Sequence, residues 1–142
     1  MKLLVDTNVL MKALIKDSLV RATLLNPAND YYIPEYAFEE IGKHIDTLEK
    51  KTGLGEEEIR LFLGILATNL RVVPKEEVLG RWSEAESIMG SVDRDDTPFV
   101  AAALASSCEA IWSDDKDFKR QNRLRILNTR EVLAGTRTRT EG

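Results

Sequence analysis

The chain has 142 residues, of which 43% are hydrophobic and 31% charged, and its formal net charge at pH 7 is −4. This length fits one domain, and the composition excludes a disordered or fibrous protein. A single cysteine, Cys108, excludes an intramolecular disulfide, and no apolar run reaches the roughly 18 residues that a membrane helix requires. Because Asp6 and Lys12 break the first apolar run, no signal peptide is predicted, and we expect a cytoplasmic protein without a membrane partner.

The chain begins with a short apolar strand that stops at Asp6. A segment of helical periodicity follows, from Val9 to Ile15. Ligands of open parallel sheets bind outside the carboxyl ends of the strands. Asp is also a good helix N-cap, but Thr7 and Asn8 can serve as caps equally well. The position of Asp6 therefore indicates an active-site acid.

The rest of the chain alternates helices with short strands. We predict helices at 18–25, 34–51, 56–70, 76–89 and 98–107, a helical turn at 130–133, and strands at 31–33, 71–73, 110–112 and 124–127. Strands that alternate with helices pair in parallel through right-handed crossovers. We therefore expect a three-layer α/β/α sandwich around a central, mostly parallel sheet of five strands. Residues 1–135 should form one domain, and the polar residues 136–142 a flexible tail.

The long helix predicted after Pro34 carries two adjacent acids, Glu39 and Glu40. At about 100° per residue, the apolar stripe of this helix centres on Ile41. Glu39 then points to solvent, whereas Glu40 lies at the border of the stripe, where its side chain can reach into a cleft. An ordinary surface glutamate would explain Glu40 equally well.

Three acids, Asp93, Asp95 and Asp96, precede the Ala-rich helix predicted at 98–107. Thr97 is a good N-cap for that helix, with Pro98 at its first position, so capping does not account for Asp96. Three acids within four residues repel one another unless a cation offsets their charge. This segment is therefore a second candidate part of the site.

A similar acidic group, Asp114, Asp115 and Asp117, follows the strand predicted at 110–112. It lacks the central Gly and the closing Glu of an EF-hand calcium loop. His44 is the only histidine and is expected at the surface, and the sequence shows no Ser-His-Asp arrangement. Carboxylates without a His or Cys cluster favour Mg²⁺ or Mn²⁺ over Zn²⁺. The separated acids therefore suggest a divalent-cation site.

Basic residues concentrate toward the end of the chain. Residues 116–142 contain eight basic residues and three acids, a net charge of +5, which leaves −9 on residues 1–115. A basic end can steer a phosphate backbone toward an acidic, metal-loaded pocket. Solvated loops and a basic tail explain the same pattern equally well.

Four segments resemble the PIN domain family and occur in that family's order: Leu3–Leu10, Pro34–Ile41, Asp95–Leu104 and Trp112–Phe118. The resemblance runs from Lys2 to about Leu133. It implies a three-layer fold and a Mg²⁺- or Mn²⁺-dependent nuclease, usually acting on RNA, with products that carry 5′-phosphate and 3′-hydroxyl ends. Many members are the toxins of VapBC-type toxin-antitoxin pairs, and homodimers are common. The resemblance thus implies an RNA substrate, a small antitoxin partner and a homodimer.

The resemblance also implies roles for individual residues. The catalytic acids are Asp6, Glu40, Asp96 and Asp115. Asp6, Asp96 and Asp115 would be metal ligands, and Glu40 a ligand or a group that positions water. Supporting residues would be Asn8, Ser113, Asp117 and Asp93, and phosphate contacts would be Lys116, Lys119, Arg120 and Arg123. Glu39 and Asp114 stay open as alternatives to their neighbours, although the spacing from Ser113 favours Asp115.

Other functions would require different residues or leave the acids unused. A phosphotransfer enzyme of the haloacid dehalogenase type would need an Asp where this chain has Asn8, and a receiver domain would need its motifs in a different order. A catalytically silent PIN scaffold that binds RNA or protein is the alternative from another class, but all four acid positions are filled. A stand-alone RNA-processing nuclease remains open beside a toxin.

Overall fold

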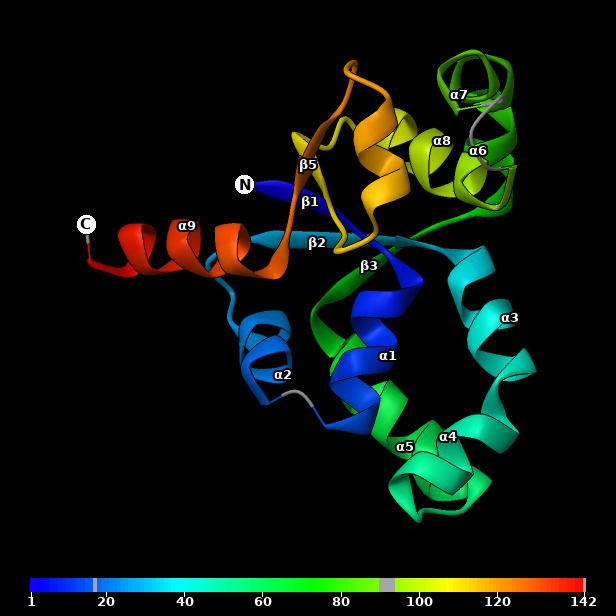
Figure 1. Ribbon diagram of the computed structural model, residues 1–142, viewed down its shortest axis with the longest axis vertical. Coiled ribbons are helices and arrows are strands. Elements are labelled where there is room, and N and C mark those ends of the chain that lie inside the picture. The colour runs from blue at the N-terminus through cyan, green and yellow to red at the C-terminus, as the bar shows by residue number, and fades with distance from the viewer. Residues whose placement is uncertain (17, 90–93, 142) are drawn as a thin grey trace.

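The computed structural model describes residues 1–16, 18–89 and 94–141. At its centre lies a parallel sheet of five strands in the order β3-β2-β1-β4-β5 (Figure 1). The strands are β1 (Lys2–Val5), β2 (Asp30–Pro34), β3 (Leu70–Val73), β4 (Ala110–Trp112) and β5 (Arg125–Leu127). The central strand β1 pairs with β2 and β4, with Leu3 opposite Tyr31 and Ala110. The predicted five-stranded parallel α/β fold is confirmed.

Helices cover both sides of this sheet. They are α1 (Thr7–Ile15), α2 (Ser18–Leu25), α3 (Glu35–Lys43), α4 (Ile45–Thr52), α5 (Glu56–Leu66), α6 (Lys75–Gly80), α7 (Trp82–Met89), α8 (Thr97–Ala105) and α9 (Thr129–Glu141). Figure 1 shows α6, α7 and α8 on one side of the sheet and α1, α2 and α5 on the other. Short 3-10 helices lie at Ala67–Asn69, Arg94–Asp96 and Lys116–Arg120, which we call η1, η2 and η3.

One part of the core lies where β1 and α8 meet. Leu3, Leu4 and Val5 of β1 are buried, and so is every residue of α8 from Thr97 to Ala103. A helix that is apolar on all sides is stable only when it is enclosed by other elements. The run of alanines lets α8 lie close to β1 and β2, which it contacts. The beginning of α8 is thereby held rigidly beside the ends of these strands.

Two helices that the periodicity predicts as continuous are each broken into two. The helix predicted at 34–51 ends as α3 and restarts as α4 at His44, where φ is −109° and ψ is 16°. The helix predicted at 76–89 breaks at Arg81, where φ is −114° and ψ is 9°. The first break lets α4 pack against α1 and α5, and the second lets α6 and α7 both pack against α8. Tertiary packing therefore overrides local helix propensity at both positions.

Several predicted boundaries also differ from the structure. The helix expected to run to residue 70 stops at Leu66, because η1 intervenes and Leu70 already pairs in β3. Asp96, and not Thr97, occupies the N-cap position of α8, because Thr97 is already helical and buried. The helical turn predicted at 130–133 is the longer α9. His44 is exposed, as expected.

Within the described ranges, no helix is both long and apolar enough to cross a membrane. The division into one domain and a flexible tail at 136–142 stays a prediction.

The turn between α4 and α5 generates a first testable prediction. Gly53 follows α4 in the left-handed region, with φ of +74°, and donates its N–H to the Glu49 carbonyl at 2.9 Å. Replacing Gly53 by Ala should lower the free energy of unfolding by about 1 kcal/mol, because a Cβ is strained at this φ. Urea denaturation measures the change.

Gly64→Ala is the matched control. Gly64 lies within α5, and a Cβ there meets no atom within 4 Å. This substitution should raise the free energy of unfolding by up to about 1 kcal/mol, because Ala is the better helix former. Equal effects of the two substitutions would contradict the assigned backbone conformation.

Candidate active site

Asp6 lies at the carboxyl end of the central strand, where β1 passes into α1. Its backbone N–H donates to the Trp112 carbonyl at 3.1 Å and so extends the pairing with β4 by one residue. Its own carbonyl accepts from the N–H groups of Val9 and Leu10 in the first turn of α1. The side chain is only 5% exposed. The fold therefore fixes the backbone of Asp6 from both sides and buries its carboxylate.

The environment of Asp6 makes its negative charge costly. Burial raises the pKa of the carboxyl group to about 6. The Ser113 hydroxyl donates to Asp6 Oδ2 at 2.8 Å and opposes this rise. The backbone N–H of Asn8 also lowers the pKa of Asp6. The Asp6 side chain nevertheless makes no helix-capping hydrogen bond. The nearby charges of Asp115 and Glu40 raise the pKa. A cation beside Asp6 would remove this cost.

In the loop after β4, Asp114 and Asp115 have different contacts, although the sequence did not decide between them. The Ser113 hydroxyl accepts from the Asp115 N–H at 3.0 Å while it donates to Asp6, so one side chain links both acids. Asp115 is half-buried. Since its charge raises the pKa of Asp6, the two carboxylates lie close together. The geometry therefore places Asp115 in the site beside Asp6.

Asp114 has a different set of contacts. Its carboxylate lies 2.7 Å from Lys12 Nζ of α1 and accepts from both the N–H and the hydroxyl of Thr129, each at 2.8 Å. Burial alone would raise the pKa of Asp114, but the hydrogen bonds from Lys12 and Thr129 outweigh it and lower the pKa. Asp114 thus joins the loop to α1 and α9.

Glu39 and Glu40 also differ from each other in their contacts. The Thr7 hydroxyl donates to Glu40 Oε1 at 2.7 Å, which ties Glu40 of α3 to the residue that follows Asp6. Glu39 instead forms an exposed ion pair with Lys75, at 2.8 Å. The helical angle thus predicts the direction of both side chains correctly, although the helix ends four residues after Glu39.

Asp96 reaches the same edge of the sheet from the other layer. Because α8 leads into β4, it runs antiparallel to the strands, and its first residues lie at their carboxyl ends. Asp96 is 8% exposed and makes no side-chain capping bond. Its Oδ2 atom is buried and accepts no hydrogen bond from the described residues, although the residue does take part in a polar interaction. The carboxylate is therefore held within the protein beside the sheet edge.

The start of α3 lies against the start of α8. The rings of Tyr36 and Phe99 are 6.3 Å apart between centroids, in an edge-to-face contact. Burial raises the pKa of Tyr36, and the charges of Glu40 and Asp95 raise it further. Glu40 and the residue before Asp96 therefore both lie near the Tyr36 hydroxyl. The four predicted acids gather at one edge, but in the described part of the chain no three carboxylate, His or Cys groups are arranged as a ready metal cage.

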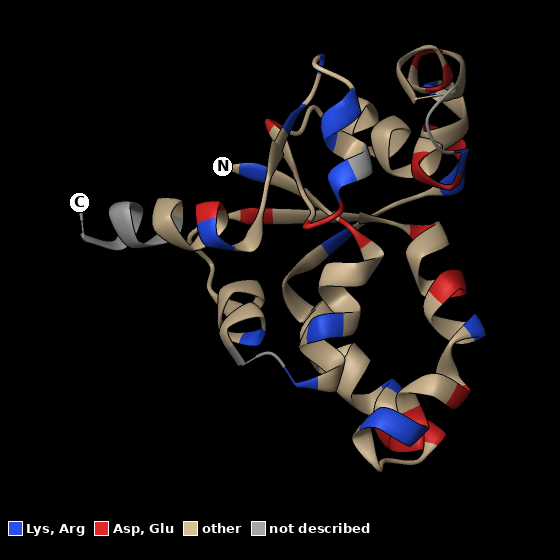
Figure 2. Ribbon diagram, viewed as in Figure 1, with Lys and Arg blue, Asp and Glu red and all other residues tan. Residues whose placement is uncertain are grey.

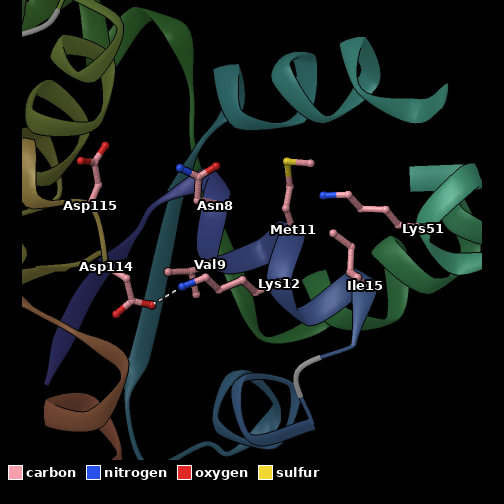
Figure 3. Close-up of a pocket in the computed structure, with 8 residues that line it drawn as sticks. All are labelled: Asn8, Val9, Met11, Lys12, Ile15, Lys51, Asp114 and Asp115. Carbon is pink, nitrogen blue, oxygen red and sulfur yellow. Dashed lines mark hydrogen bonds and ion pairs between the residues drawn. The ribbon is translucent and has the colours of Figure 1, made fainter. Parts of the chain in front are cut away.

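The remaining predicted residues lie around this edge. Asn8 is exposed beside Asp115 at the rim of a groove (Figure 3). Lys116, Lys119 and Arg120 are exposed on η3, which follows directly from the acidic loop (Figure 2). Arg123 pairs with Glu84 of α7 at 2.6 Å. Asp93 lies outside the described residues, and of Asp117 only the backbone, within η3, is described.

The groove beside Asp115 contains two lysines that the sequence analysis missed. It has a volume of about 360 Å³ and is lined by Asn8, Val9, Met11, Lys12, Ile15, Lys51, Asp114 and Asp115. In Figure 3, Lys51 extends from α4 into the groove from the end opposite to the two acids. Lys12 lies one helical turn after Asn8, so helical spacing could have identified it. The position of Lys51 depends on the break at His44, which no local pattern predicts.

The donor atoms at this edge, though not their arrangement within the described residues, suit Mg²⁺ or Mn²⁺. They are carboxylate and hydroxyl oxygens, which these hard cations prefer. The lone cysteine is half-buried, and burial raises the pKa of its thiol to about 12, so it is a poor metal ligand.

Comparisons with known proteins agree on the fold. A family model described as PIN domain matches residues 4–134. No curated protein is similar enough to count as a match. Solved structures with a similar fold include VapBC2 from Rickettsia felis bound to a DNA fragment from their promoter, at 18% identity and a TM-score of 0.70. VapBC-1 from nontypeable Haemophilus influenzae has 17% identity and a TM-score of 0.64. The alignments cover 90% and 92% of this chain and 98% and 99% of those chains, respectively.

The burial of Asp6 predicts how stability depends on pH. The folded pKa of about 6 exceeds the ordinary 3.8, so the folded protein loses stability as pH rises through this interval. Asp6→Asn carries no charge and should raise the free energy of unfolding at pH 8 in EDTA by about 1 to 3 kcal/mol. At pH 3.5 the difference should largely vanish. Chemical denaturation at both pH values measures this difference. A variant that is less stable than the wild type at pH 8 would contradict the claim that the buried charge of Asp6 destabilises the fold.

The different contacts of Asp114 and Asp115 predict different effects on stability. Asp114→Ala should lower the free energy of unfolding by about 1 to 2 kcal/mol, because it removes hydrogen bonds to Lys12 and Thr129. Asp115→Ala should lower it by clearly less, because it also removes a like charge beside Asp6. Thermal and urea unfolding compare the two. A larger loss in Asp115→Ala would mean that the two roles are exchanged.

Proposed function

The chain belongs to the PIN domain family, and from that premise we propose that it is a divalent-metal-dependent ribonuclease of the VapC type. PIN domains are generally nucleases. One observation carries the proposal. Carboxylates from three separate elements, Asp6, Glu40 and Asp115, converge at the carboxyl edge of the sheet, where Ser113 links Asp6 to Asp115, Thr7 holds Glu40, and the charges of Glu40 and Asp115 raise the pKa of Asp6.

Each acid has a distinct part in the proposed site. Asp6, Asp96 and Asp115 hold Mg²⁺ or Mn²⁺, directly or through water. When bound, such an ion orients the phosphodiester, lowers the pKa of a water molecule and stabilises the leaving oxygen. Glu40, fixed by the Thr7 hydroxyl, is a further ligand or positions the attacking water. All four acids are present, which favours catalysis over a silent scaffold.

Hydroxyl groups keep these acids in place. Ser113 both donates to Asp6 and accepts from the Asp115 N–H, so one hydroxyl group links the two acids. Thr7 is buried, and its hydroxyl holds Glu40 toward Asp6. Such supporting contacts commonly decide how tightly a metal is bound and how well it functions. Ser113 and Thr7 are therefore positioning residues in this proposal.

Cations beside the acids supply the contacts to RNA. Lys116, Lys119 and Arg120 extend along η3 from the acidic loop, and Lys51 extends into the adjoining groove (Figures 2 and 3). Arg123, paired with Glu84, lies beside Lys119 and Arg120 in a polar pocket. Phosphate contacts of this kind give affinity without sequence preference. The RNA backbone thus follows η3 and the groove on either side of the acids.

The likeness to two VapBC structures supports a partner protein as part of the proposal. In this proposal a small antitoxin protein binds the chain, and the nuclease is a homodimer that acts in the cytoplasm. The alignments cover nearly the whole of the matched chains.

Cleavage of RNA by the purified protein tests the proposed function. The wild type should cut a labelled mixed-sequence RNA in Mg²⁺ or Mn²⁺ and leave it intact in EDTA. Asp6→Asn and Asp96→Asn should each lower the rate on the order of 10²- to 10³-fold, because each removes a charge that the reaction requires. Calorimetry should also show divalent-ion binding by the wild type and weaker binding by both variants.

Two adjacent glutamates on α3 provide the matched control. Glu40→Gln should lower the rate at least about tenfold, whereas Glu39→Gln should stay within about threefold of the wild type, because its carboxylate faces Lys75. A wild type that neither cuts RNA nor binds a divalent ion would overturn the catalytic proposal. Metal binding without cleavage of the mixed RNA would contradict a broad substrate range and require a narrow target.

A further inference from the structure

A second pocket lies beside the acidic edge, on the other side of Tyr36. Its volume is about 320 Å³, and residues of α3, α6, α7, η2 and α8 line it. Its apolar walls include Tyr36, Val78, Leu79 and Trp82, and its charged residues are Lys75, Arg94 and Asp95, of which Lys75 is paired with Glu39. The proposed catalytic site uses none of these residues.

Folding of the chain alone does not explain the apolar character of this pocket. Leu79 is 67% exposed, and Trp82 is only half-buried. Because large apolar side chains are seldom left at the surface around a well-formed concavity without a ligand, the pocket is a candidate binding site. It is also close to the acids, since Tyr36 lines it while the charge of Glu40 acts on the Tyr36 hydroxyl.

We propose that this pocket binds the nucleobase of a nucleotide next to the cleaved phosphodiester in single-stranded RNA. The inference rests on the proposed ribonuclease function and extends it to the recognition of the substrate. Trp82 and Tyr36 provide aromatic faces for stacking, and Arg94 provides a cation at the same pocket for the adjoining phosphate. Proteins that bind single-stranded RNA combine aromatic platforms with cations in this way.

Both aromatic walls pack against buried residues. The edge-to-face contact with Phe99, which is buried in α8, holds the ring of Tyr36. Trp82 packs partly against the core at the start of α7. A preformed platform costs little entropy when a base stacks on it. The combination of aromatic faces and a cation therefore favours a nucleotide.

Binding of short oligonucleotides tests the proposal without any cleavage. The parent protein is the full chain with Asp6→Asn, in EDTA, and the probes are labelled pentaribonucleotides of adenosine, cytidine or uridine and an all-abasic pentamer with the same backbone. Fluorescence anisotropy gives the dissociation constants. At least one base-bearing pentamer should bind about tenfold tighter than the abasic pentamer, as expected for one stacked base.

Variants at Trp82 assign this base-dependent gain to the pocket. Trp82→Ala should reduce the base-dependent gain in affinity to less than about twofold. The affinity of this variant for the abasic pentamer should stay unchanged, which also shows that the variant is folded. Trp82→Phe should retain most of the gain, because it keeps an aromatic face. Ser83→Ala, at the next and exposed position of α7, should retain all of it.

Failure of the inference is distinguishable from failure of the proposed function. A base-dependent gain that survives Trp82→Ala, the absence of any gain, or an equal loss for base-bearing and abasic RNA would each overturn the pocket assignment, even if the wild type cleaves RNA. A gain that depends on Trp82 in a protein that neither cuts RNA nor binds a divalent ion would instead support the pocket and overturn the nuclease.

Discussion

The organisation of the site depends on one buried carboxylate, Asp6, at the end of the central strand. Parallel pairing of β1 with β4 brings Asp6 beside Ser113, whose hydroxyl contacts Asp6 and the Asp115 backbone together. Burial makes the Asp6 charge costly, and the neighbouring acids increase that cost. A carboxylate retained in such surroundings is characteristic of functional sites rather than of stabilising ones. The elements around Asp6 therefore act chiefly to hold a charge that the fold alone would not favour.

The order of the strands explains why this position suits a ligand. The chain moves from β1 to β2 and β3 on one side, and then returns to place β4 and β5 on the other side of β1. The loops that leave β1 and β4 therefore turn in opposite directions and open a crevice between them, which is where open α/β sheets bind ligands. Asp6 and Asp115 come from the two strands that flank this crevice. Glu40 and Asp96 approach it from the two helical layers.

Local patterns predicted the features that depend on short-range chemistry. Asp6 was predicted from a strand end and the direction of Glu40 from helical angle, whereas Asp115 came from the family resemblance, with the spacing from Ser113 favouring it over Asp114. The structure shows where these side chains lie, and their roles stay predictions. The breaks at His44 and Arg81 were not predicted, because they arise from the packing of α4 against α1 and α5 and of α6 and α7 against α8. The position of Lys51 in the groove and the apolar pocket beside Tyr36 both depend on these breaks. Local sequence patterns could therefore not predict them.

Two pairs of adjacent acids at this edge share one arrangement, in which one acid pairs with a lysine and the other faces the proposed site. Asp114 engages Lys12 while Asp115 faces Asp6, and Glu39 engages Lys75 while Glu40 receives the Thr7 hydroxyl. In each pair the lysine at the border of the site contacts the neighbour and not the proposed catalytic acid. An ion pair with the catalytic acid would lower its pKa and occupy the oxygens that a metal needs. The neighbouring acid thus engages the lysine in an ion pair, while the proposed catalytic acid stays directed at the site.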